Sequence, residues 1–384
     1  MLLGLRHFLT ARFSSKASPT PQVLLHPAKE GDVLNQQYSL KRRLGAGFGT
    51  RSTMWLSRDS LTGNDVVLKI TGADSTDAGK YSQLEVDFLQ KVKQVRGSAQ
   101  QQHIIGMMDY FSLNSSFRTH SCLVLEVLGI SIEELTQRTL PNKFPIPMCK
   151  QIIKQVLLGL DFLHRECGIV HTDLKLDNFL LCLEDTKGIP MLGDSALPID
   201  LSSISLGPLS VVITNFGVAS HIEKPFDGVI QPYALRAPEV YLGIPYSSSA
   251  DIWSMAYELL CFIYFERISQ AFELVTYCWL FNPEALAQWS QEDDHLGQMV
   301  SINRLTMFPV DVLACGKFSA KYFGGSGNLL KYNVRKGSIV TMIQTRYPLQ
   351  PKDGPELLAD MLSRMLRLHI RKNPFATYLP PRYT

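Results

Sequence analysis

The sequence predicts an α+β fold, with a strand-rich first part followed by a larger helical part. Segments typical of strands lie at residues 44–56, around a glycine-rich turn, and in the short apolar runs at residues 66–70 and 123–129. A helical repeat then places apolar residues at every third or fourth position over residues 152–163. Strands followed by helices, rather than alternating with them, favour an α+β arrangement. The 384 residues suffice for two or three folding units.

The composition is that of an ordinary globular protein and excludes several classes. Hydrophobic residues make up 45% of the chain and support a large core. A net charge of +3 is too small to indicate direct binding to nucleic acid or a membrane surface. The seven cysteines are scattered without a C-x-x-C pair, as expected for reduced thiols of an intracellular protein. The longest apolar stretch, residues 252–265, is too short to span a bilayer and predicts a buried core helix.

The first 29 residues contain no acidic side chain but carry Arg6, Arg12 and Lys16 among several serines. This composition is typical of a mitochondrial transit peptide. The alternative is an undirected tail, with the protein in the cytoplasm or nucleus. Prolines at positions 19, 21 and 27 predict an extended linker. We therefore expect residues 1–37 to be a leader and linker, with structure beginning near Tyr38.

Residues 44–56 predict two strands around a glycine-rich turn. Glycines such as Gly45 and Gly47 let backbone N–H groups approach a phosphate closely, although an ordinary hairpin turn needs similar residues. The next strand, residues 66–70, is apolar except for Lys69. A lysine in such a strand is usually an edge residue when taken alone.

A helical pattern follows over residues 81–92, with Leu84, Phe88 and Leu89 on one face. Glu85 lies within this helix and, taken alone, would be a solvated residue. Residues 123–129 then form a strand that runs into Gly129.

The most informative stretch is the polar loop from His171 to Asn178, directly after the helical repeat. Asp173 and Asn178 lie five residues apart, with Lys175 between them. The apolar residues 179–181 predict a short buried strand after the loop.

An insertion of about residues 184–209 lacks any clear period and predicts a loop excursion. A strand and turn resume at residues 211–217, which end in Asn215-Phe216-Gly217. The triplet at residues 237–239 reads Ala-Pro-Glu, and Asp251 opens the long apolar helix.

Taken in this order, the motifs resemble those of a eukaryotic protein kinase from about Tyr38 to the end of the chain. The resemblance implies a bilobal fold, with a small β-rich N-lobe and a large helical C-lobe. The N-lobe would comprise residues 38–128. The C-lobe would comprise residues 129–384, including the insertion.

The resemblance also implies a role for each polar residue. Asp173 would accept the proton of the substrate hydroxyl, Lys175 would balance charge on the phosphoryl group, and Asn178 would ligate a metal ion. Lys69, paired with Glu85, would hold the phosphates of ATP. The implied cofactors are ATP and Mg²⁺, with Mn²⁺ as an alternative metal. The remaining nucleotide contacts would come from Leu44, Gly45, Gly47, Ser52, Met54, Val67, Glu126, Leu128 and Leu180.

Finer features resemble the SR-protein kinase family, whose members phosphorylate serines in Arg/Ser-rich proteins. These features are His171-Thr172-Asp173, residues 52–56 after the glycine-rich turn, residues 126–129, and the long insertion. The likeness is strongest to shorter fungal-type members. It implies a protein substrate, rich in arginine and serine if the family pattern holds.

Asn215 is the most consequential departure from the family. It occupies the position of the D-F-G aspartate, which normally ligates the catalytic magnesium. An amide oxygen can ligate magnesium but carries no charge. Asp194, within the insertion, is an alternative source of the carboxylate, although no Phe-Gly pair follows it. As a metal site we therefore expect Asn178 and Asn215.

Three smaller departures accompany it. The glycine-rich turn is two residues longer than in the family, with Ser52 near the third glycine position. Val67 is larger than the usual alanine and narrows the adenine slot. Asn373 stands where the family has an arginine that pairs with Glu239, and Arg371 is a candidate substitute.

Two hypotheses follow for the function. The first is an active serine/threonine kinase with a weakened metal site, because Lys69, Glu85, Asp173, Lys175 and Asn178 are all present. The second is a pseudokinase, a nucleotide-binding or structural scaffold without efficient phosphoryl transfer, which Asn215 and Asn373 favour.

Overall fold

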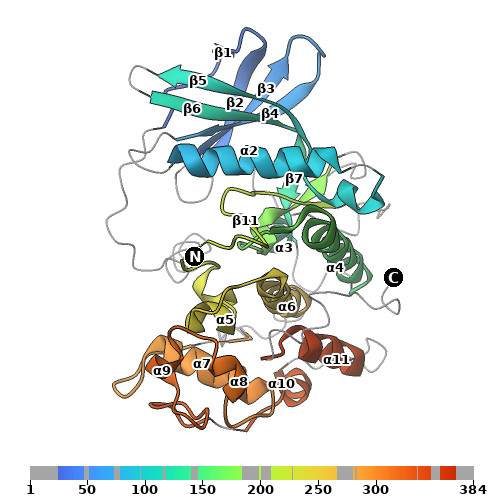
Figure 1. The fold of residues 1–384 in the computed structure, drawn as a ribbon. Helices are drawn as coiled ribbons and strands as arrows, with labels where there is room; N and C mark the ends of the chain where they lie inside the picture. The colour runs from blue at the N-terminus through green and yellow to red at the C-terminus, as the bar shows by residue number, and fades with distance from the viewer. Residues whose placement is uncertain are drawn as a thin grey trace.

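The computed structural model describes a chain folded into two lobes (Figure 1). Residues 1–24 of the leader, the tip of the glycine-rich turn with Gly47, most of the insertion with Asp194, and the end with Arg371 and Asn373 lie outside the described residues. The described residues are 25–46, 52–72, 78–95, 97–115, 118–139, 146–183, 199, 209–226, 228–265, 280–281, 283–334, 336–346 and 355–368.

The N-lobe is built on one antiparallel sheet of six strands in the order β1-β2-β3-β4-β6-β5. The strand β1 lies ahead of the expected start at Tyr38 and pairs with β2. The central strand β4 is buried at every residue after the first, which explains its nearly continuous apolar run. The six strands are β1 (Val33–Leu34), β2 (Tyr38–Ala46), β3 (Ser52–Asp59), β4 (Asp65–Thr71), β5 (Met107–Ser115) and β6 (Arg118–Leu125).

The two faces of β4 pack against different cores, and this determines where Lys69 points. Val66 and Leu68 belong to a small core within the N-lobe, whereas Val67 belongs to the main core. Because side chains alternate between the faces of a strand, Lys69 shares the face of Val67. That face is covered by α2 (Ala78–Gln94), which confirms and lengthens the helix predicted over residues 81–92. Its residue Phe88 is fully buried in the main core.

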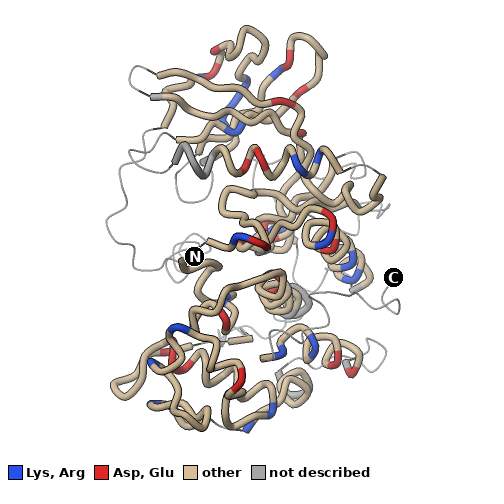
Figure 2. Tube along the Cα trace, viewed as in Figure 1, with Lys and Arg blue, Asp and Glu red and all other residues tan. Residues whose placement is uncertain are grey.

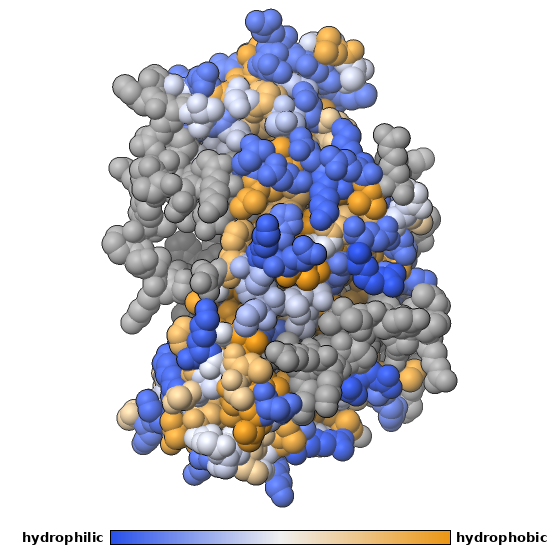
Figure 3. Space-filling model, viewed as in Figure 1, coloured by the Kyte–Doolittle hydropathy of each residue, from blue (hydrophilic) through white to orange (hydrophobic). Residues whose placement is uncertain are grey.

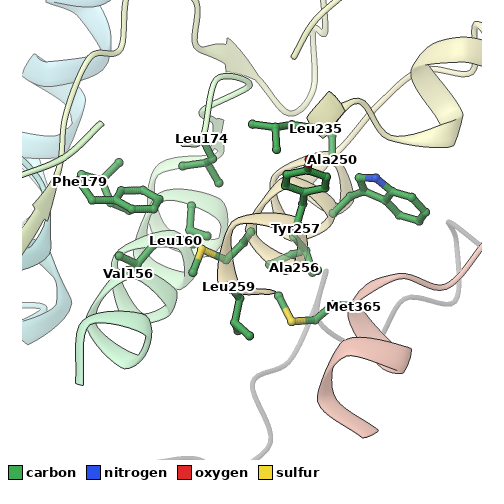
Figure 4. Close-up of a cluster of buried hydrophobic side chains, with 14 of the residues drawn as sticks. Val156, Leu160, Leu174, Phe179, Leu235, Ala250, Ala256, Tyr257, Leu259 and Met365 are labelled. Carbon is green, nitrogen blue, oxygen red and sulfur yellow. The ribbon is translucent and has the colours of Figure 1, made fainter. Parts of the chain in front are cut away.

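The C-lobe is helical and is organised around α6 (Ser248–Phe265). Every described side chain of α6 from Ser248 to Leu259 is buried, which confirms the predicted core helix. Figure 4 shows α6 between α4 (Ile146–Asp161) and α11 (Pro355–Met365). Among the helices that the structure describes, none combines the length and the apolar character needed to cross a membrane. The other helices are α3 (Ile132–Arg138), α5 (Pro238–Leu242), α7 (Gln291–Ile302), α8 (Val310–Leu313), α9 (Ser319–Tyr322) and α10 (Ile339–Arg346).

Two small antiparallel sheets at the junction of the lobes place two loops side by side. One has the order β10-β9-β7 and the other pairs β11 with β8. Residues 171–178 connect β8 to β9, and residues 214–219 connect β10 to β11, so the paired strands hold both loops together at each end. The strand β9 confirms the prediction for residues 179–181. The strands are β7 (Leu128–Ser131), β8 (Ile169–Val170), β9 (Phe179–Cys182), β10 (Val211–Ile213) and β11 (Ser220–His221).

The link between the lobes corrects the single strand predicted over residues 123–129. The strand β6 ends at Leu125, and β7 begins at Leu128 in a different sheet. Glu126 lies in the break, where its Oε1 accepts a hydrogen bond from the N–H of Gly106 at 2.5 Å. An apolar run gives no sign that the chain changes sheets, because strand periodicity is the same in both.

The surface carries charges of both signs along both lobes (Figure 2). On the face shown in Figure 3, hydrophobic residues gather toward the end of the C-lobe that lies away from the N-lobe. Several large apolar side chains between residues 305 and 330 are at least one-third exposed, namely Leu305, Met307, Val310, Phe318 and Leu330.

Candidate active site

A buried ion pair joins β4 to α2. Lys69 Nζ donates to Glu85 Oε1 at 2.7 Å, and the two side chains retain only 11% and 5% of their exposure. The pair lies close to the 214–219 loop. A Cβ atom added to Gly217 would be 3.5 Å from Glu85 Oε2. Removing either partner would leave a buried charge without its counter-ion, so the two residues act as a unit.

Asp251 at the start of α6 holds the loop of residues 171–178 from below. Its Oδ2 accepts the backbone N–H of His171 at 2.7 Å, and its Oδ1 accepts that of Thr172 at 2.8 Å. His164 Nε2 lies 2.8 Å from the same carboxylate. Asp251 is fully buried, and the sequence interpretation gave it no role. Its partners lie about eighty residues away in the chain, so local spacing could not have revealed them.

The ring of His171 ties the two loops together. Its Nε2 lies 2.8 Å from the carbonyl oxygen of Thr214, and its Nδ1 lies 3.3 Å from the N–H of Asp173. Because a carbonyl only accepts, Nε2 carries the proton and Nδ1 accepts from Asp173. The buried imidazole thus fixes the position of Asp173 relative to the second loop.

Thr172 contacts the second loop directly. Its backbone has φ of +66°, an unusual conformation for a β-branched residue, and Asp251 holds it there. Its Oγ1 donates to the carbonyl oxygen of Val218 at 2.7 Å. The short hydroxyl therefore binds backbone at this position, where the H-R-D template of many protein kinases has an arginine.

Asp173 lies at the centre of the polar loop and has two neighbours that hold its carboxylate. Lys175 Nζ is 2.8 Å from Asp173 Oδ2, and the two side chains keep 13% and 17% of their exposure. Asn178 Nδ2 donates to the carbonyl oxygen of Asp173 at 2.7 Å and reaches its Oδ2 at 3.3 Å. The carboxylate is thus oriented without being sealed from an incoming substrate.

The structure brings the two predicted metal ligands together and bonds them to each other. Asn215 Nδ2 donates to Asn178 Oδ1 at 3.2 Å, and Lys69 Nζ donates to Asn215 Oδ1 at 3.3 Å. Asn215 has φ of +68°, a left-handed conformation that asparagine adopts more readily than most residues. The ion pair of the N-lobe and the polar loop of the C-lobe therefore meet at Asn215.

Five of the predicted nucleotide contacts belong to the main core or pack against it. Val67 and Leu128 are buried in the main core, and Leu44, Met54 and Leu180 pack against it with part of their surface open. Gly45 pairs with Met54 across β2 and β3, with φ of +159°. Ser52 lies directly after the glycine-rich turn. It begins β3, where it is buried and pairs with Thr71.

Three carboxylates to which the sequence interpretation gave no role lie within or close to the polar loop. Burial, together with the charge of Asp177, raises the pKa of Glu133 to about 7. Burial also raises the pKa of Asp177, and the charge of Asp173 adds to the shift. Burial raises the pKa of Glu258 well above its usual value, with contributions from Glu133 and Asp177. We call Glu133, Asp177 and Glu258 the acidic cluster.

Glu239 of the Ala-Pro-Glu triplet accepts a hydrogen bond from α6. Its Oε1 accepts a hydrogen bond from Ser249 Oγ at 2.9 Å, and burial raises its pKa. The expected partners at positions 371 and 373 lie outside the described residues. Within the described part of the chain, Ser249 is therefore the side chain that satisfies Glu239.

The β-rich lobe carries a lysine–glutamate pair, and the helical lobe carries a polar Asp-x-Lys-x-x-Asn loop next to it. This arrangement defines an ATP-dependent phosphotransferase of the protein kinase class. Comparison with known families agrees, since the protein kinase domain model matches residues 38–273. The chain belongs to the protein kinase family.

Curated relatives place it near the SR-protein kinases. The chain is 29% identical to the serine/threonine-protein kinase SRPK of Physarum polycephalum, over 93% of this chain and 89% of the relative. It is 25% identical to protein kinase dsk1 of Schizosaccharomyces pombe, over 92% of this chain and 81% of the relative. It is 38% identical to human SRSF protein kinase 3 over 42% of this chain. The chain is an SR-protein kinase-like eukaryotic protein kinase.

Protein kinases use ATP and a divalent metal ion, but the side chains at this site fit such an ion poorly. Magnesium is usually held through carboxylates, whereas the two expected ligands here are neutral amides whose oxygens already accept hydrogen bonds. Nowhere in the described residues do three or more His, Cys, Asp or Glu side chains gather as a metal centre.

Proposed function

We propose that this chain transfers the γ-phosphate of ATP to serine or threonine hydroxyls of a protein, at a low rate. The observation that carries the proposal is the joined geometry of the site. Asp173 is oriented by Lys175 and Asn178, and the Lys69–Glu85 pair reaches the same loop through Asn215. Positioning and electrostatics supply most of the catalysis in phosphoryl transfer, and these residues supply both.

The proposed reaction uses the chain's own groups as follows. The substrate hydroxyl oxygen attacks the γ-phosphorus as the bond to the β,γ-bridging oxygen breaks, and ADP leaves. The hydroxyl proton passes to the carboxylate of Asp173. Lys69 neutralises charge on the ATP phosphates, and Lys175, which is 2.8 Å from Asp173, stabilises charge on the transferred group.

The acidic cluster supports an arginine-bearing substrate. Burial and the nearby charge of Asp177 raise the pKa values of Glu133 and Glu258, so a positive charge at this place would be favourable. Lys175 opposes this shift at Asp177 and Glu258, but it is itself bound to Asp173. An arginine next to the target serine would supply the missing positive charge and could pair with a carboxylate through two parallel hydrogen bonds. We therefore propose Arg/Ser-rich segments as the substrate class.

A second candidate function rests on the Asn178–Asn215 contact. The two amides satisfy each other, so the site closes without a charged ligand at position 215. A chain of this kind could hold a nucleotide and signal by interaction alone, as a pseudokinase. The alternative predicts ATP binding with no phosphate transfer to any peptide.

A transfer assay separates the two candidates. Purified protein is given labelled ATP with Mg²⁺ or Mn²⁺ and one of two peptides, an Arg-Ser repeat or a Lys-Ser repeat of equal charge. We expect slow labelling of the Arg-Ser peptide, weaker labelling of the Lys-Ser peptide, and none with the Asp173→Asn variant. Equal labelling of both peptides would contradict the arginine proposal. Labelling no higher than in the Asp173→Asn variant would establish the pseudokinase alternative.

A further inference from the structure

A directed chain of hydrogen bonds crosses the site from the N-lobe to the C-lobe. Lys69 Nζ donates to Asn215 Oδ1 at 3.3 Å, and Asn215 Nδ2 donates to Asn178 Oδ1 at 3.2 Å. Asn178 Nδ2 then donates to the carbonyl oxygen of Asp173 at 2.7 Å. Three bonds thus connect the lysine that faces the phosphates to the backbone of the residue that faces the substrate hydroxyl.

The two ends of this series of hydrogen bonds determine the orientation of both amide groups. An ammonium group only donates, so Asn215 must present its oxygen to Lys69 and its nitrogen to Asn178. A backbone carbonyl only accepts, so Asn178 must present its nitrogen to Asp173 and its oxygen to Asn215. The requirements from both ends agree at the central bond. The orientation of the pair is therefore set by the network itself.

An aspartate at position 215 could not complete the same series of hydrogen bonds. It would place a carboxylate oxygen opposite the amide oxygen of Asn178, and two acceptors repel each other unless a cation lies between them. Asparagine replaces one of these oxygens with an N–H donor, so the contact closes directly. The amide also brings no negative charge toward the phosphates of a bound nucleotide.

We propose that this chain binds ATP without a divalent metal ion, and that the Asn178–Asn215 amide pair takes the structural place of the ion. The inference rests on the proposed function in one respect, that ATP binds between the lobes at Lys69. The phosphates would be neutralised by Lys69 and would accept hydrogen bonds from nearby donors. The site then fits a metal ion poorly because it binds ATP without one.

The test measures the dissociation constant of ATP by titration calorimetry, once with a chelator and once with excess Mg²⁺. For the natural protein we expect values within about threefold of each other. For Asn215→Asp we expect binding to become weaker in chelator than in Mg²⁺ by about tenfold or more, because a buried carboxylate would face the phosphates. Lys69→Ala should weaken binding under both conditions and so locates the nucleotide at this site.

Two further variants separate charge from shape. Asn64→Asp makes the same chemical change at an exposed turn of the N-lobe and should behave as the natural protein. Asn215→Gly accepts the left-handed backbone and removes the amide without adding charge. It should lower ATP affinity equally in chelator and in Mg²⁺. Thermal melting of each variant shows whether it is folded.

Each outcome bears on a different claim. ATP binding by the natural protein only with Mg²⁺ would overturn the inference and leave the kinase proposal standing. If the dissociation constant of ATP is the same with and without Mg²⁺ in both the natural protein and Asn215→Asp, the role given to the amide pair is wrong. Binding under neither condition would overturn both the inference and the kinase proposal.

Discussion

At the scale of single residues, the proposed mechanism divides the site into groups that act on the nucleotide and groups that act on the substrate. Lys69 and Glu85 belong to the first, and Asp173 and Lys175 to the second. Asn178 and Asn215 connect them. The division implies that changes on the two sides have separable effects on ATP binding and on turnover.

Asp173→Asn tests the substrate side. The variant should lose transfer by about 10²–10⁴-fold, because removing a positioned base has an effect of that size. ATP affinity should stay within about twofold, since Asp173 contacts the hydroxyl rather than the nucleotide in the proposed reaction. Turnover equal to that of the natural protein would refute the mechanism.

The acidic cluster makes substrate affinity depend on pH. The pKa of Glu133 is raised to about 7, so its carboxyl group loses its proton as the pH rises from 6 to 8 and becomes able to attract a guanidinium. KM for an Arg-Ser peptide should therefore fall with rising pH, by about fivefold if the pair contributes about 1 kcal/mol. Glu133→Gln should remove the dependence, and a neutral serine peptide serves as the control. If KM depends on pH in Glu133→Gln as it does in the natural protein, a group other than Glu133 causes the dependence.

At the scale of elements, the segment from Gly217 to Ala237 is held by packing and hydrogen bonds. Gln231 has φ of +66°, and its Nε2 donates to Ala250 O at 2.7 Å and Ser254 Oγ at 2.8 Å. Its Oε1 accepts the N–H of Ala237 at 2.9 Å. One buried glutamine thus fixes the segment on α6, and Arg236 adds hydrogen bonds within the segment, to the carbonyl oxygens of Ile230 and Gln231 at 3.2 Å.

This arrangement predicts activity without phosphorylation of the segment. The hydroxyl-bearing residues between Gly217 and Ala237 are Ser220 and Tyr233, and Ser220 is fully buried. The hydroxyl of Tyr233 is buried as well. Thr172 also stands where many kinases have the arginine that binds a phosphorylated loop. Phosphatase treatment, checked by mass spectrometry, should leave the rate unchanged. A large loss of rate traced to this segment would contradict the prediction.

At the scale of the whole molecule, α6 supports both the core and the catalytic loop. Asp251 is the link, because it is fully buried in α6 and accepts two backbone N–H groups of the loop. A loop that is hydrogen-bonded to this buried helix is stabilised by the packing of the core. This explains how a polar turn with a left-handed threonine keeps one conformation.

Asp251→Ala should therefore affect stability and activity together. It leaves the N–H groups of His171 and Thr172 buried without an acceptor, at a cost of about 1–3 kcal/mol each. The free energy of unfolding, measured with urea, should fall by about 2–6 kcal/mol by that estimate, and transfer should be lost. Asp251→Asn, which keeps one acceptor oxygen, should lose less stability. An alanine variant as stable as the natural protein would contradict this role.

The sequence predicted the α+β fold, and it indicated candidate site residues without indicating most of the contacts among them. Lys69 and Glu85 could be paired because a strand and a helix follow each other in the order known from kinases. The role of Asp251 could not be predicted, since its partners are distant in the chain. The hydrogen bond between Asn178 and Asn215 depends on side-chain orientations that the neighbours impose. The acidic cluster forms only when α3, α6 and the loop come together.

The central claim is that this chain is a serine/threonine kinase slowed by the amide at position 215. The most direct test is kcat for an Arg-Ser peptide in the natural protein and in Asn215→Asp, both with saturating ATP and Mg²⁺. We predict that the variant is faster by about 10²–10³-fold, because a charged contact in a preorganised site contributes about 2.7–4 kcal/mol to the transition state. A variant no faster than the natural protein would contradict the claim.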